Sequence, residues 1–263
     1  MNKRINGINV KIFGEETKQS LVFIHGFPFD HTLWDGVISK LKDEYYCISY
    51  DIRGFGDSEL NTGQYTMESF TEDLENIIAR LELDKPIICG FSMGGYIALR
   101  ANEKLRGSYK ALILANTTTS SDNDEAKLKR AEAISNIDTK GVEPFVDGFL
   151  SAAFSKDFIK KEPLKLEKIK NKIMNLNPTA IKGALLAMIS RTDTTRSLDD
   201  IEIPVLLISA ENDNIISPDT MTQMANKIKN STLVCLSGSG HVSMLEKPDE
   251  FTSAVKNFLK NSF

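Results

Sequence analysis

The chain has 263 residues, of which 41% are hydrophobic and 26% are charged, and its net charge at pH 7 is −4. This is the composition of a soluble globular protein, and the acidic balance argues against a nucleic-acid-binding protein, which needs a basic face. No stretch approaches the roughly 18 apolar residues of a membrane span, and the N-terminal segment carries no secretory signal, so we expect a cytoplasmic protein without membrane association.

The first predicted elements are short strands. Arg4–Ile5 and Asn9–Phe13 flank a turn at Gly7 and are predicted to form an antiparallel hairpin at one edge of a sheet. Several later apolar runs are continuous rather than alternating, which is typical of parallel strands buried on both faces. These predicted strands are Leu21–His25, Tyr46–Tyr50, Pro86–Gly90, Lys110–Ala115, Ile203–Ser209 and Thr232–Leu236.

Amphipathic segments separate these runs. Met67–Leu81 and Pro248–Leu259 each place their apolar residues on one helical face, and Gly95–Asn102 continues a helix directly after a strand. Alternating strand and helix signals predict an α/β protein with a mostly parallel sheet.

One long interval breaks this alternation. Between the strands that end at Ala115 and begin at Ile203, the sequence has helical patterns and no convincing strand. The predicted helices are Asp124–Asn136, Pro144–Phe154, Pro163–Asn175 and Pro178–Ser190, three of which begin with the proline favoured in a first helical turn. The interval is too long for one crossover, so we predict a helical cap, residues 117–198, inserted into a core domain of residues 1–116 and 199–263.

A candidate nucleophile lies between a predicted strand and a predicted helix, in Gly90-Phe91-Ser92-Met93-Gly94-Gly95. This G-x-S-x-G arrangement is a nucleophile elbow, in which a sharp strand-to-helix turn strains the serine and leaves no room for bulky neighbours. Ser92 would stand at the carboxyl end of the sheet and at a helix N-terminus. The alternative, a glycine-rich turn with a capping serine, stays open from the pattern alone.

A serine nucleophile needs a base within hydrogen-bond reach. The chain offers His25, His31 and His241. His241 follows the last predicted strand in Gly-Ser-Gly-His and is predicted at the same end of the sheet as Ser92. We assign His25 to shaping the loop after its strand, and His31 to the approach of a helix.

The base in turn needs an acceptor that fixes its tautomer. Asp213 follows the strand Ile203–Ser209 and is our candidate, with Glu211 in the same loop as the alternative. The rival position after the Lys110–Ala115 strand is occupied by Asn116, which carries no charge. The order serine, aspartate, histidine along the chain fits this topology.

Two amides are candidates for holding an oxyanion. The Met93 N–H lies at the start of the helix after Ser92, and the Phe27 N–H lies in the loop His25-Gly26-Phe27-Pro28, where the proline has no amide hydrogen. A second glycine loop, Asp51–Ser58, lacks the spacing of a nucleotide-binding fingerprint, and we expect Asp51 and Arg53 to hold it structurally.

The cysteines and histidines do not form a metal pattern. Cys47, Cys89 and Cys235 are widely spaced, each in a predicted strand, so we expect buried thiols rather than disulfides. No pair has zinc spacing, and neither a metal nor another cofactor is expected.

Taken together, these motifs resemble the α/β-hydrolase superfamily over nearly the whole chain. The likeness is carried by HGFP at 25–28, DIRGFGDS at 51–58, GFSMGG at 90–95, ENDNIISP at 211–218 and GSGHVSMLEKPDEF at 238–251. The resemblance implies an eight-stranded, mostly parallel sheet with a helical lid. It also implies a triad of Ser92, Asp213 and His241 with oxyanion amides from Phe27 and Met93.

A finer likeness points to the 3-oxoadipate enol-lactonase group, many members of which are esterases. We therefore expect a hydrolase of a small-molecule ester or lactone that works through an acyl-enzyme. Ser92 argues against the relatives with an aspartate nucleophile, the haloalkane dehalogenases and epoxide hydrolases. The alternatives are a carbon–carbon bond hydrolase, a cofactor-free perhydrolase, or a binding protein that keeps the triad but turns over poorly.

Overall fold

The computed structural model describes residues 1–62 and 65–263. In these residues one sheet of eight strands has the order β1-β2-β4-β3-β5-β6-β7-β8, with β1 and β2 antiparallel at one edge and β3 to β8 parallel. The strands are β1 (Asn2–Ile5), β2 (Ile8–Phe13), β3 (Ser20–Ile24), β4 (Tyr46–Tyr50), β5 (Ile87–Phe91), β6 (Ala111–Ala115), β7 (Val205–Ala210) and β8 (Ser231–Leu236). The predicted class, eight-stranded sheet and edge hairpin are confirmed.

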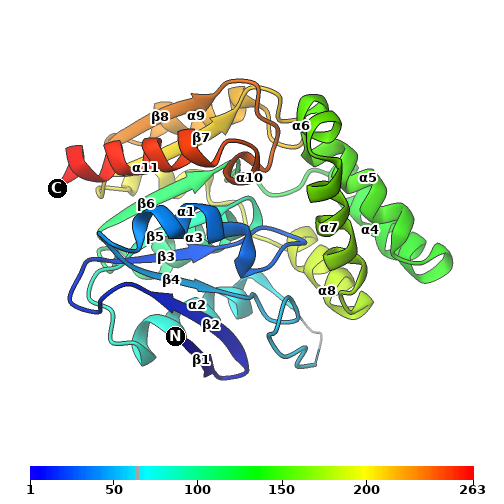
Figure 1. Ribbon diagram of the computed structural model, residues 1–263, viewed down its shortest axis with the longest axis horizontal. Coiled ribbons are helices and arrows are strands. Elements are labelled where there is room, and N and C mark those ends of the chain that lie inside the picture. The colour runs from blue at the N-terminus through cyan, green and yellow to red at the C-terminus, as the bar shows by residue number, and fades with distance from the viewer. Residues whose placement is uncertain (63–64) are drawn as a thin grey trace.

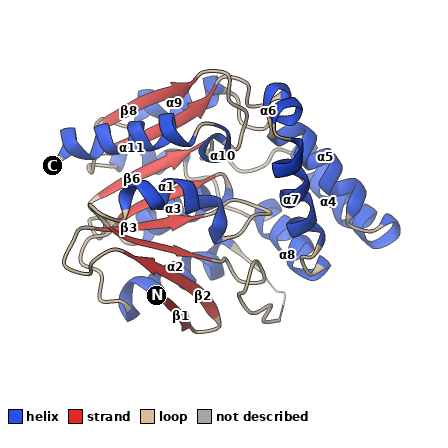
Figure 2. Ribbon diagram, viewed as in Figure 1, coloured by secondary structure: helices blue, strands red, loops and turns tan. Residues whose placement is uncertain are grey.

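Helices cover both faces of the sheet (Figures 1 and 2). One face packs against η1 (His31–Trp34), α1 (Asp35–Leu41) and α11 (Pro248–Ser262), and the other against α2 (Met67–Arg80), α3 (Met93–Lys104) and α9 (Pro218–Lys227). A short helix, α10 (Ser243–Glu246), precedes α11. Among the described helices, none has both the length and the apolar character needed to cross a bilayer.

The continuous apolar runs are explained by this two-sided burial. Successive side chains of a strand point to opposite faces, so a strand covered on both sides needs apolar residues throughout. On β3, Leu21 and Phe23 enter the cluster beneath α1 and α11, whereas Val22 and Ile24 enter the cluster beneath α2 and α3.

Five α-helices lie between β6 and β7, and we call them the helical insertion. They are α4 (Asp124–Lys140), α5 (Glu143–Ala153), α6 (Lys156–Lys161), α7 (Pro163–Met174) and α8 (Pro178–Ile189). A 3-10 helix, η2 (Thr195–Asp200), follows them before β7. Figure 1 places the helical insertion beyond the carboxyl ends of the parallel strands. The two ends of this segment meet where the Thr194 amide donates to the Thr119 carbonyl at 3.0 Å. The helix α6 is additional to the four predicted.

The cysteine prediction was wrong at one position. Cys47 and Cys89 are buried, and burial raises the pKa of the Cys47 thiol to about 12. Cys235 is exposed, because β8 is the last strand of the sheet and its outer positions lack full cover.

The Arg53 guanidinium fastens the Asp51–Ser58 loop to α2, as the structural role predicted for Arg53 requires. Its Nε and Nη2 atoms donate to the two carboxylate oxygens of Asp73 at 2.7 Å each, and Nη2 also reaches the Ser69 carbonyl at 3.1 Å. The Asp73 side chain is 6% exposed and that of Arg53 is 17% exposed. Such a shielded, two-pronged pair is costly to break from one side.

Replacing Asp73→Ala should therefore lower the free energy of unfolding by about 3 kcal/mol, because the Arg53 charge stays shielded without its acceptor. Urea denaturation followed by circular dichroism measures this. Glu72→Ala, an exposed carboxylate on the same helix, is the matched control and should stay within about 0.5 kcal/mol of the parent. Equal losses in the two variants would contradict the expectation.

Candidate active site

The backbone at Ser92 is held in a strained turn between β5 and α3. Its φ is 51° and its ψ is −115°, a conformation that residues with a side chain rarely adopt. A Cβ atom on Gly90 would lie 2.4 Å from the Gly94 carbonyl oxygen, and one on Gly94 would lie 2.3 Å from the Ile24 carbonyl oxygen. Only glycine fits at these two positions, which is the physical reason for the G-x-S-x-G pattern.

The structure brings Ser92, His241 and Asp213 together. The Ser92 Oγ atom lies 3.0 Å from His241 Nε2, and His241 Nδ1 lies 2.7 Å from Asp213 Oδ2. Both distances are hydrogen bonds, and the His241 ring is 1% exposed. Ser92 directly follows β5, and Asp213 and His241 lie in the loops after β7 and β8, at the carboxyl ends of these parallel strands. This arrangement allows His241 to accept the Ser92 proton while Asp213 receives the opposite N–H.

Asp213 is held as a hydrogen-bond acceptor on both oxygens. Its Oδ1 atom accepts from the Ile215 and Ile216 amides at 2.8 and 2.9 Å. Its Oδ2 atom accepts from Asn116 Nδ2 at 3.0 Å in addition to His241. Asn116, at the end of β6 with a φ of 45°, is oriented by Ser243, whose hydroxyl donates to Asn116 Oδ1 at 2.9 Å. Asn116 is thus a donor to the carboxylate.

The alternative residues lie elsewhere. Glu211 is exposed and accepts from the Ser237 hydroxyl and the Gly238 amide, so it supports the turn before His241 from the outside. His25 is fully buried, with Nδ1 donating to the Gly26 carbonyl and Nε2 accepting from the Ile52 amide. Burial lowers the pKa of His25, which keeps it neutral in this loop-shaping role.

The two candidate oxyanion amides are those of Met93, next to the serine in sequence, and of Phe27, in the loop after β3. Met93 is the first residue of α3, where backbone N–H groups have no partner within the helix. In the described part of the chain, the Phe27 amide donates to no other backbone group. Their role toward an oxyanion stays a prediction.

Aromatic side chains of the helical insertion lie over the loop that carries Phe27. The Phe27 ring centroid is 5.8 Å from that of Phe145 and 6.3 Å from that of Phe149, and both rings belong to α5. Phe154 stacks on Phe158, and Met188, a residue of α8, packs in the hydrophobic core. These two side chains therefore hold the helices in place rather than lie over the Phe27 loop.

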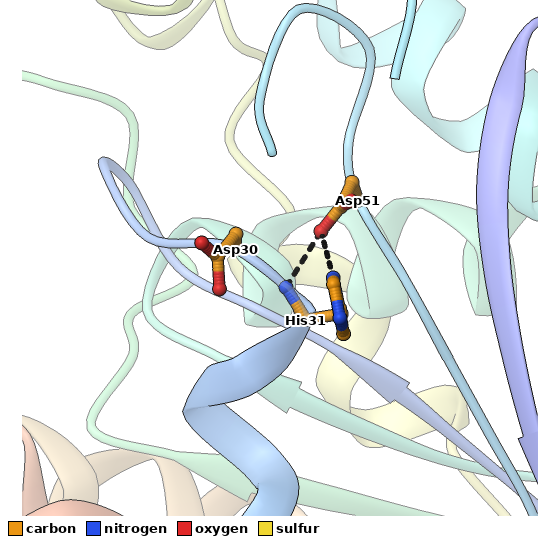
Figure 3. A group of neighbouring side chains, drawn as sticks. All are labelled: Asp30, His31 and Asp51. Carbon is orange, nitrogen blue, oxygen red and sulfur yellow. Dashed lines mark hydrogen bonds and ion pairs between the residues drawn. The ribbon is translucent and has the colours of Figure 1, made fainter. Parts of the chain in front are cut away.

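Asp30, His31 and Asp51 form a second cluster (Figure 3). The backbone and ring Nδ1 nitrogens of His31 both donate to Asp51 Oδ1 at 2.7 Å, and Asp51 Oδ2 accepts from Asn9 Nδ2 and the Asp57 amide. Asp30 accepts from the Thr32 amide and from Lys172 Nζ. These donors already occupy the oxygens that a cation would need, so hydrogen bonding accounts for the cluster, and the structural role predicted for Asp51 agrees with it.

A family model described as the alpha/beta hydrolase fold matches residues 19–248. The chain belongs to the α/β-hydrolase family. The α/β-hydrolase is 26% identical to 3-oxoadipate enol-lactonase 2 of Acinetobacter baylyi, over 96% of this chain and 93% of that protein. It is 31% identical to a pimeloyl-(acyl-carrier protein) methyl ester esterase of Legionella pneumophila, over 91% and 95% of the two chains.

Among solved structures, a thermophilic esterase from Thermogutta terrifontis matches the α/β-hydrolase with a TM-score of 0.93 at 29% identity, covering 100% of this chain and 99% of that one. The resemblance to the enol-lactonase and carboxylesterase group is confirmed.

Two polar residues of the α/β-hydrolase site were missed as contributors by the sequence reasoning. Asn116 carries no charge and so is excluded as the acid from sequence, but an amide at that position can donate to an acid elsewhere, as it does to Asp213. Glu246, within GSGHVSMLEKPDEF, contacts the loop of His241 through the Gly240 amide at 3.1 Å. The available signal was a charged residue five positions after the histidine, directly after the apolar pair Met244-Leu245.

The Asn116→Asp substitution should lower kcat/KM of the α/β-hydrolase by about 10- to 100-fold, the equivalent of losing one charged hydrogen bond and adding a like charge beside Asp213. Steady-state hydrolysis of an aryl ester measures it. Asn123→Asp, which keeps a good N-cap residue for α4, is the control with unchanged kinetics. Parent-like activity in Asn116→Asp would show that the amide donor is dispensable.

The His31–Asp51 pair predicts a pH-dependent stability. Burial alone would lower the pKa of His31, but the hydrogen bond and charge of Asp51 together raise it above its ordinary 6.5. The pair therefore contributes its full stabilisation below the unfolded-state pKa and loses it as pH rises through the folded-state pKa. His31→Asn keeps a donor that does not titrate.

The difference in the free energy of unfolding between the parent and His31→Asn should be larger at about pH 6 than at about pH 9. Urea titrations at each pH measure it. The opposite contribution of His25, which is lost as pH falls, is present in both proteins and cancels. A difference that does not change with pH would rule out this assignment.

Proposed function

We propose that this α/β-hydrolase cleaves a small-molecule carboxylic ester or lactone through an acyl-enzyme formed on Ser92. The observation that carries the proposal is the unbroken hydrogen-bonded series from Ser92 through His241 to Asp213, at 3.0 and 2.7 Å. A serine, a base and an orienting acid in this geometry form the arrangement that activates a hydroxyl for acyl transfer.

The comparisons confirm the coarser statement, a hydrolase that acts on ester bonds. The relatives named above include an enol-lactonase and a methyl ester esterase, which supports both ring and open-chain esters as substrate classes. The triad roles, the acyl-enzyme and the requirement for no cofactor are the finer part of the proposal.

The proposed reaction has two halves. Ser92 Oγ attacks the substrate carbonyl while His241 Nε2 accepts its proton, and Asp213 stabilises the imidazolium. The Phe27 and Met93 amides donate to the oxyanion, and His241 then gives its proton to the leaving alkoxide. A water molecule, activated by His241, releases the acid and restores Ser92. For a lactone, the leaving alkoxide stays attached to the acyl group.

We propose that residues 117–198 act as the lid under which the substrate binds. A groove of about 310 Å³ runs between α7 of the helical insertion and the segment Pro28–Asp35. Its apolar lining, from Phe29, Leu33, Ile169, Ile173, Leu176 and Leu245, suits the hydrocarbon part of an ester. Pro28, the residue after Phe27, is among the lining residues, whereas Ser92 and His241 are not, so the groove would hold a part of the substrate away from the reacting carbonyl.

The Arg191 guanidinium is bound by groups of the protein itself, so we assign it no substrate carboxylate. Its guanidinium donates to Asp122 and to the Ser120 carbonyl and stacks on the Tyr96 ring at 4.3 Å. Asp122 also accepts from Arg130 Nε at 2.5 Å. Arg191 is therefore already engaged in a buried salt bridge with Asp122.

The test is labelling with a fluorescent alkyl fluorophosphonate, followed by hydrolysis of p-nitrophenyl esters of varied chain length and of simple and enol lactones. We expect labelling and ester or lactone turnover in the parent, and a loss of turnover of at least about 10³-fold in Ser92→Ala.

Absence of labelling in the parent would overturn the acyl-enzyme proposal and favour a binding protein. Labelling without ester or lactone turnover would direct the search to carbon–carbon bond cleavage or perhydrolysis on the same serine.

A further inference from the structure

Glu246 joins three parts of the chain beside the candidate base. It is the last residue of α10, five positions after His241. Its Oε1 atom accepts from the Gly240 amide at 3.1 Å, and its Oε2 atom accepts from the Ser155 hydroxyl at 2.5 Å and the Ser155 amide at 3.3 Å. Gly240 precedes His241, and Ser155 lies in the helical insertion. One carboxylate thus bonds both the histidine loop and the helical insertion.

The corner between α5 and α6 is packed tightly against the same loop. A Cβ atom on Gly240 would lie 2.6 Å from the Ser155 nitrogen and 2.9 Å from the Phe154 carbonyl carbon. Ser155 is itself fixed, because its hydroxyl oxygen accepts from the Phe158 amide at 3.2 Å and caps α6. These close contacts leave no free space between the two segments. A shift of the helical insertion would therefore also shift the loop that carries His241.

We propose that Glu246 is a positioning residue, which sets the His241 imidazole against Ser92 only while the α5–α6 corner of the helical insertion is in place. The catalytic base then depends on a segment some 90 residues away in sequence. This inference rests on the proposed serine hydrolase function and goes beyond it, because it assigns the helical insertion a part in the geometry of the base as well as cover for the substrate.

Glu246 lies in surroundings that disfavour a charged carboxylate, so its position there needs compensating contacts. Burial raises the pKa of Glu246, and the nearby charge of Asp213 acts in the same direction, so this position is unfavourable for a carboxylate. The Gly240 and Ser155 donors offset that penalty by giving both oxygens partners. A misplacement of about 1 Å in a reacting group can cost about 100-fold in rate, so a small shift of the Gly240 backbone would be felt at Ser92.

The experiment compares variants at Glu246 and Ser155, singly and combined, with the parent in ester hydrolysis and in the rate of fluorophosphonate labelling. Glu246→Ala should lower kcat and the labelling rate by about 10- to 100-fold while KM changes less than about threefold. Glu246→Gln, which keeps an acceptor for the Gly240 amide, should recover most of this loss. Ser155→Ala should lower kcat by several-fold, and its effect should largely disappear in the Glu246→Ala background, because the two residues act through one contact.

The matched control is Asp157→Asn. Asp157 is an exposed carboxylate of α6 that lines the same surface cavity as Ser155 and Glu246 but pairs only with Lys161 in the described residues. Its kinetics should equal those of the parent. Thermal unfolding of every variant separates lost geometry from lost folding, and Glu246→Gln combined with Ser155→Ala serves as the test should Glu246→Ala fail to fold.

Equal labelling rates in the parent and Glu246→Ala would overturn the positioning role alone, and so would an equal loss in Asp157→Asn or a loss confined to KM. A parent protein that is not labelled would instead overturn the proposed function.

Discussion

The candidate site depends on the strained backbone of Ser92. A non-glycine residue in such a conformation costs about 1–3 kcal/mol, which the surrounding structure has to supply. Here the neighbouring strand supplies it, because the Ser92 amide donates to the Ala115 carbonyl at 3.0 Å and the Thr117 hydroxyl donates to the Ser92 carbonyl at 2.8 Å. The serine is therefore held by the end of β6, and the same strand end provides Asn116 for Asp213. The residues at the end of β6 therefore support both the strained backbone of Ser92 and the charged carboxylate of Asp213.

Each acidic side chain near the strand ends has its own hydrogen-bond donors. Asp213 has amides and Asn116, Asp51 has His31 and Asn9, and Glu246 has Gly240 and Ser155. Each carboxylate is thus matched locally rather than by a shared cation. An uncharged residue at position 116 belongs to this pattern, because a carboxylate there would replace the amide donor to Asp213 with a second negative charge.

Much of this could be predicted from the sequence, because the signals were local. Continuous apolar runs indicated buried parallel strands, and glycine spacing around Ser92 reported a backbone need that no other residue meets. Contacts between distant segments left no such trace. The bond between Ser155 and Glu246, the donor role of Asn116 and the exposure of Cys235 at a sheet edge all depend on which elements become neighbours. Periodicity cannot report that, since it describes one element at a time.

The helical insertion leaves and rejoins the sheet through adjacent strands, and its two ends are tied at Thr119 and Thr194. A segment that starts and finishes at nearly one point can be exchanged for another of different length without moving either strand. Chimeras made at this junction would keep the Ser92 turn unchanged and carry a different inserted segment next to it. Under the positioning role proposed for Glu246, any donor segment would also have to present a serine-like partner to Glu246, so compatibility with the loop of the candidate base, rather than with the sheet, would decide which exchanges succeed.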